Sequence, residues 1–125
     1  AVNFAGDTLQ PFAIFRASED GSVSKKLDQE INNRIVEVNS TNYFTKTTML
    51  KWVDQCLKPF IDHKRMEYGR TAALLMMDNF STHQTCKVRS KIAELGCIQL
   101  KLPSNATSKL QMLDVGINKP FKDYL

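Results

Sequence analysis

Two aspartates, Asp78 and Asp114, are the residues of this chain whose type and surroundings best suit metal chemistry. Asp78 ends an unbroken apolar run at residues 72–77, and a further 35 residues separate it from Asp114. A carboxylate that leaves the end of a buried strand lies where ligands bind in α/β sheets. A second carboxylate beside it makes a hard-oxygen site that suits Mg²⁺ or Mn²⁺. The two aspartates therefore predict a divalent-cation site.

Each of these residues also has a purely structural interpretation. Asp78 can cap the helix that follows it, and Asp114 can be an exposed carboxylate near the favourable end of a helix dipole. His83, five residues after Asp78, is either a surface residue in a first helical turn or a contact to Asp78 or to a phosphate. A charge at the end of an apolar strand is costly unless it is paired, exposed or metal-bound, which favours a functional role for Asp78.

The first half of the chain must supply strands and a helix that support this site. Residues 1–5 and 10–15 resemble strands around a turn at Gly6, which predicts an antiparallel hairpin, and residues 34–38 predict a third strand. Residues 18–33 are polar and aperiodic, as is typical of a surface loop. A helix should begin at Thr45 or Thr47, and Pro59 should kink or end it.

The second half alternates strands and helices. The continuous apolar character of residues 71–78 predicts a central strand buried on both faces. A helix from Ser81 or Thr82 to Gly96 leads to a strand at residues 97–102, which should be parallel to the first and connected by a right-handed crossover. A last helix carries apolar residues at helical spacing: Leu110, Leu113, Ile117, Phe121 and Tyr124. The fold class is therefore α/β, with a mixed sheet flanked by helices.

Composition bounds the kind of protein. The 125 residues form one domain or a piece of one, and no apolar stretch reaches the ~20 residues of a membrane span. Three cysteines without metal-ligand spacing argue against a disulfide framework or a zinc site and favour a reducing compartment. Residues 78–125 hold seven Lys/Arg against four Asp/Glu. This basic excess suits a polyanionic substrate, or it is a solvated face.

Several motifs resemble the DDE superfamily transposase or endonuclease domain of the pogo/Tigger group, which includes centromere-protein-B-like and jerky-like relatives. The resemblance covers nearly the whole chain and is weakest at residues 16–43. The motifs that carry it are Asp78-Asn79 with His83, Leu102-Pro103, Asn105, Thr107-Ser108, Leu110-Gln111, Leu113-Asp114, Gly116-Ile117 and Phe121-Lys122, together with residues 11–15 and the Trp52 helix ending at Lys58-Pro59.

This resemblance implies an RNase H-like fold over residues 1–125 and two-metal cleavage of DNA. Asp78 and Asp114 would correspond to the family's second and third acids, and each would bind Mg²⁺ or Mn²⁺, with two ions in the intact site. Asn79, His83 and Gln111 would support the acids. The basic residues expected to hold the DNA backbone are Lys87, Arg89, Lys109, Lys119 and Lys122.

The chain departs from the family pattern at Ser104, Ala106 and Met112. The family's first acid ends a strand upstream of the point where this chain begins, and Asp7, in a turn, is a poor substitute. The domain is thus expected to be N-terminally truncated, without its first strand, and inactive as a DNA-cutting enzyme by itself.

Three functions remain open at this stage. The first is the catalytic core of a DDE transposase that cleaves DNA and transfers strands, and the second is a domesticated or decayed relative that binds DNA or protein without nuclease activity. A receiver-like domain phosphorylated on Asp78 is the third, but residues 1–5 lack the acidic pair that it requires. A DNA substrate implies location in the nucleus, no membrane partner is expected, and the intact protein is a candidate homodimer.

Overall fold

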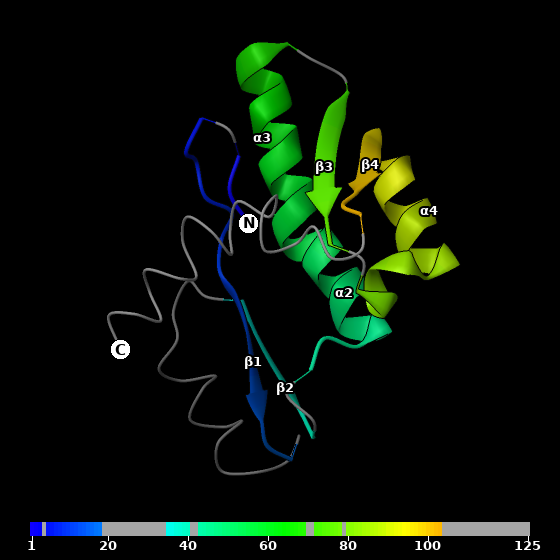
Figure 1. Cartoon of the computed structure of the whole chain (residues 1–125). Coiled ribbons are helices and arrows are strands. Elements are labelled where there is room, and N and C mark those ends of the chain that lie inside the picture. The colour runs from blue at the N-terminus through cyan, green and yellow to red at the C-terminus, as the bar shows by residue number, and fades with distance from the viewer. Residues whose placement is uncertain (4, 19–34, 41–42, 70–71, 79, 104–125) are drawn as a thin grey trace.

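The computed structural model describes residues 1–3, 5–18, 35–40, 43–69, 72–78 and 80–103 (Figure 1). Their fold class is α/β, as the sequence predicts. The elements, in chain order, are β1 (Phe12–Arg16), β2 (Ile35–Asn39), α2 (Lys46–Trp52), the π-helical segment η1 (Val53–Leu57), α3 (Lys58–Tyr68), β3 (Ala73–Met77), the 3-10 helix η2 (Ser81–Gln84), α4 (Cys86–Glu94) and β4 (Cys97–Lys101).

The predicted N-terminal hairpin is wrong in its extent and in the pairing of its second strand. Among the described residues 1–3 and 5–9, a tight turn carries a single antiparallel bridge, between Val2 and Thr8. The Asn3 side chain closes this turn, because its Oδ1 accepts the backbone N–H groups of Ala5 at 3.0 Å and Asp7 at 2.8 Å. Those donors are therefore not available to extend an antiparallel ladder.

Strand β1 pairs instead with β2, in parallel, from Phe12 opposite Ile35 to Arg16 opposite Asn39. The described strands thus form two separate two-stranded parallel sheets, β1–β2 and β3–β4, rather than one mixed sheet (Figure 1).

The long helical stretch from Lys46 to Tyr68 begins as expected and continues past Pro59. Thr45 caps it, since its Oγ1 accepts the backbone N–H of Thr48 at 3.1 Å. Pro59 does not end the helix. The π-helical segment η1 precedes it, and the Lys58 N–H donates to the carbonyl of Val53, five residues back. This wider turn accommodates a proline that has no N–H of its own to donate.

The predicted parallel strand–helix–strand unit is confirmed for β3 and β4, which pair from Ala73 opposite Cys97 to Met77 opposite Lys101. The prediction that the first of these strands is buried on both faces is wrong. Exposure alternates along β3, and Leu74 is 59% exposed. Among the described residues, only β4 pairs with β3. The partly buried side chains of β3 pack against the helical core on one face of the strand only.

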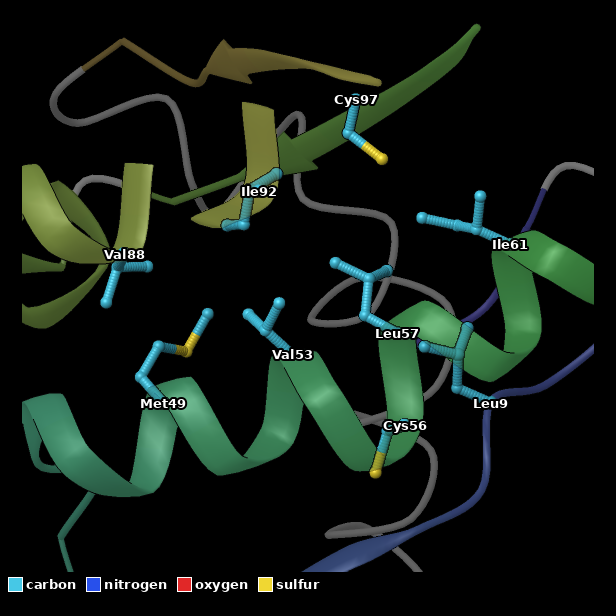
Figure 2. Packing of buried hydrophobic residues seen from close by; sticks show 9 residues of the cluster. All are labelled: Leu9, Met49, Val53, Cys56, Leu57, Ile61, Val88, Ile92 and Cys97. Carbon is cyan, nitrogen blue, oxygen red and sulfur yellow. The ribbon is translucent and has the colours of Figure 1, made fainter. Parts of the chain in front are cut away.

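The core lies between the long helical stretch and the β3–β4 unit. Figure 2 shows Met49, Val53 and Leu57 pointing from the helix toward Val88 and Ile92. Val53, Val88 and Ile92 are fully buried. This cluster packs α4 against the long helical stretch. Because α4 connects β3 to β4, the same packing holds the carboxyl end of β3 in place.

Candidate functional site

Asp78 is the first residue after β3, which confirms its predicted place at the end of a strand. Strand β4 leaves the sheet at the same end, because the Leu102 N–H donates to the carbonyl of Met77 at 3.0 Å. Asp78 is half-buried there. The carboxyl ends of two parallel strands therefore meet beside this carboxylate, which is where α/β sheets bind their ligands.

The Asp78 side chain also shapes the turn that follows it. Its Oδ1 accepts the backbone N–H of Phe80 at 3.3 Å, two residues further along the chain. The helices downstream have other N-cap residues, Phe80 for η2 and Thr85 for α4. Asp78 is thus not the N-cap residue of either helix. A carboxylate can accept about four bonds, so this turn contact is compatible with binding a cation as well.

The other residues of the predicted site cannot be placed around Asp78. Asn79 lies outside the described residues, and only the backbone of His83 is described, within η2. Asp114 and four more predicted site residues also lie outside the described residues: Lys109, Gln111, Lys119 and Lys122. Within the described ranges, no group of three or more His, Cys, Asp or Glu could hold a metal ion. Asp78 is therefore the one proposed metal ligand whose position is known.

Two of the predicted DNA contacts, Lys87 and Arg89, lie on α4. Both are exposed, while Val88 between them is fully buried against the core. Lys91 on the same helix is engaged differently, because its Nζ lies 2.9 Å from Asp54 Oδ1. The hydrogen bond that Lys91 donates to the Asp54 carboxylate raises the pKa of Lys91. Lys87 and Arg89 are thus placed on the outside of α4, where a phosphate backbone can reach them.

Lys101 is a basic residue near Asp78 that the predicted site omitted. It is the last residue of β4, it is exposed, and its register partner is Met77, the residue immediately before Asp78. Neighbouring strands lie roughly 4.8 Å apart, so the Lys101 backbone lies about one strand spacing from Met77 and next to the start of Asp78. The parallel register of β3 and β4 was the signal that could have identified it.

An apolar hollow of about 610 Å³ lies beside β3, with Asp78 among its lining residues. Most of its lining is hydrophobic and comes from residues 1–9, the long helical stretch and β3. Lys64 lines this hollow, and its Nζ lies 2.8 Å from Asp7 Oδ2 and 2.7 Å from Glu67 Oε2. The hydrogen bond to Lys64 lowers the pKa of Asp7. These partners already balance the Lys64 charge, so the hollow suits apolar packing better than phosphate binding.

Comparison with known proteins gives one family and one relative. The sequence model of the DDE superfamily endonuclease family matches residues 1–125. The protein named MFS-type transporter clz9, from Cochliobolus lunatus, is 25% identical over 122 residues, which are 97% of this chain and 13% of that protein. No solved structure matches.

The transporter name describes a much longer protein, of which this chain matches only a small part. In the described part of the chain, no helix is long and apolar enough to cross a membrane. The similarity to that protein therefore concerns one shared segment, and the activity in its name is not carried over.

Proposed function

This chain belongs to the DDE superfamily endonuclease family, and from this membership we propose that it is the catalytic core of a DNA transposase or endonuclease. The proposed domain spans residues 1–125, has an RNase H-like architecture and belongs to the pogo/Tigger group. The observation that supports the chemistry is the position of Asp78, at the carboxyl end of β3 and beside the exit of β4.

The donor chemistry of this position fits a divalent cation. Carboxylate oxygens are the preferred ligands of Mg²⁺ and Mn²⁺, and Asp78 is half-buried rather than enclosed in an apolar core. We assign Asp78 and Asp114 as the metal-binding acids. Two such ions, when bound, activate the attacking oxygen and stabilise the leaving oxygen in phosphodiester cleavage. The Phe80 N–H holds one Asp78 oxygen and thereby restricts the orientation of the carboxylate.

The basic residues of the proposed site hold the DNA through its phosphates. Lys87, Arg89 and Lys101 are exposed around α4 and the end of β4, and such contacts fix the position of a duplex without reading its bases. Lys109, Lys119 and Lys122 join them in this proposal, and Asn79, His83 and Gln111 support the acids. We propose the nucleus as the location of the protein, because its proposed substrate is DNA, and a homodimer as the state of the intact protein.

The test is a plasmid-nicking assay on the intact protein that carries this chain, with Mg²⁺ or Mn²⁺ supplied. Asp78→Asn keeps the side-chain volume and the acceptor for Phe80 but removes the charge, so nicking should fall at least about 100-fold while DNA binding is retained. Asp62→Asn is the matched control, because Asp62 is an exposed acid of α3 paired with Lys58 at 2.7 Å. It should leave nicking within about twofold of wild type.

Two results would contradict the proposal. If Asp78→Asn nicks DNA as well as Asp62→Asn does, Asp78 is not a metal ligand in the reaction. If the wild-type protein binds DNA but never nicks it under either metal, the domain is a transposase-derived binding module without nuclease activity.

A further inference from the structure

Phe80 is an exposed aromatic residue next to the candidate metal ligand Asp78. It is 42% exposed, and it lies two positions after Asp78, immediately before η2. The other exposed aromatic residues in the described part of the chain are Phe15, Tyr43 and Tyr68, and none of these is adjacent to a residue of the proposed site. A single exposed apolar side chain is ordinary on a protein surface. The significance of Phe80 therefore depends on how and where it is held.

The backbone at Phe80 is fixed on both sides. Its N–H donates to Asp78 Oδ1 at 3.3 Å, which closes a turn in which the aspartate side chain takes the place of a backbone carbonyl. Residues 81–84 then form η2, which packs against α2 and α4. The position of the Phe80 residue is therefore coupled to that of the Asp78 carboxylate.

Exposed cations lie on the elements next to this turn. Lys101 ends β4 opposite Met77, and Lys87 lies in the first turn of α4, which follows η2. Two residues of chain span at most about 7 Å, and successive phosphates of one DNA strand are about 3.4 Å apart along the helix axis. A DNA strand held at Asp78 thus brings one of its next two nucleotides within reach of Phe80.

We propose that Phe80 stacks on the base beside the phosphate to be cleaved, after that base has left its pair. This inference rests on the proposed function and specifies its substrate as DNA with an unpaired nucleotide at the cleavage point. Aromatic rings flanked by cations bind single-stranded nucleic acid in this way, because every base has a π-face. The preference should therefore follow the ease of unpairing, since an already mismatched base costs least to unstack.

The test compares the binding of two short DNA duplexes by the intact protein that carries this chain. One duplex is fully paired, and the other has the same sequence except for one mismatched pair at its centre. All variants carry Asp78→Asn, which keeps an acceptor for the Phe80 N–H and removes the charge that repels a phosphate. With no divalent cation added, fluorescence anisotropy gives the two dissociation constants. The protein with Phe80 intact should bind the mismatched duplex at least about fivefold more tightly.

Phe80→Leu is the test variant, because leucine keeps an apolar side chain but has no π-face. It should weaken binding of the mismatched duplex at least about fivefold and change binding of the paired duplex by less than about twofold. Phe15→Leu is the matched control, since Phe15 is 39% exposed and lies in the other sheet, on β1. Equal losses for the two substitutions, or a mismatch preference that Phe80→Leu leaves unchanged, would overturn the proposal.

Phe80→Trp reports on the stacking directly. Its added indole fluorescence should be quenched when the mismatched duplex binds, because the ring then lies against a base, and much less when the paired duplex binds. The protein with phenylalanine at position 80 gives the background signal. Absence of additional quenching in Phe80→Trp overturns the proposal, whatever Phe80→Leu does.

Urea unfolding distinguishes recognition of DNA from support of the fold. Should Phe80→Leu unfold the domain, the quenching in Phe80→Trp decides the question. The nicking assay reports on the proposed function separately. A mismatch preference that depends on Phe80, without any nicking by the wild-type protein, refutes the proposed nuclease alone. Nicking that Asp78→Asn abolishes, together with a mismatch preference independent of Phe80, refutes the stacking alone.

Discussion

Ile92→Ala should strongly destabilise the domain, because Ile92 joins α4 to the long helical stretch. Ile92 is 0% exposed, and Val53 and Val88 in the same cluster are also 0% exposed. The substitution removes about three buried carbon groups, or about 2.4 kcal/mol of transfer free energy at about 0.8 kcal/mol each. A cavity that the packed neighbours close only partly adds further cost, for a total of about 3–4 kcal/mol.

Urea unfolding measures this loss, with far-ultraviolet circular dichroism and the fluorescence of Trp52, which packs against the core, as two probes. With a slope of about 2 kcal/mol per molar urea, the midpoint should fall by roughly 1.5–2 M. Ser90→Ala, at an exposed position of the same helix, should change the free energy of unfolding by less than about 0.5 kcal/mol. A loss below about 1 kcal/mol for Ile92→Ala, at an unchanged slope, would refute the packing described for this helix.

Two further predictions concern the helix cap and the ion pair at the N-terminal turn. Thr45→Ala removes the acceptor for the Thr48 N–H and should lower the free energy of unfolding in urea by about 1 kcal/mol. Thr47 is exposed and is not the cap residue, so Thr47→Ala should lower it far less. Equal effects of the two substitutions would contradict the capping assignment. The hydrogen bond from Lys64 lowers the pKa of Asp7 below its ordinary value of 3.8. A lowered carboxyl pKa stabilises the fold above the unfolded-state value, and this stabilisation is lost as pH falls through the folded-state value. Thermal unfolding of Lys64→Gln should therefore depend less on pH below about 4 than wild type does. Identical pH profiles would show that this half-buried pair contributes nothing measurable to stability.

The sequence alone was sufficient for features that depend on neighbouring residues. A side chain three residues before a backbone N–H can cap it, so Thr45 was identifiable as one of two candidates. The apolar run before Asp78 and the helix before Gly96 predicted β3, α4 and β4 in order, and the short crossover made parallel pairing the expected result. The position of Asp78 at a strand end follows from these local signals.

Other features of the fold depended on contacts between distant segments. The pairing of β1 with β2 joins residues more than twenty positions apart, and nothing local in either strand specifies that partner. The apolar run of β3 has the same composition whether one face or both are covered, so only the packed structure showed that Leu74 and Met76 are exposed. Lys101 likewise became a candidate contact only when the register placed it opposite Met77.

By itself, then, the sequence determined the position of Asp78 at a strand end and the order of the elements around it, because hydrogen-bonding caps and hydrophobic periodicity act over a few residues. Only the tertiary structure decided which strands pair, how Pro59 is accommodated and which face of β3 is left open. These features depend on which apolar surfaces, from segments distant in the sequence, are buried against each other. That choice depends on the packing of the whole chain rather than on any one segment.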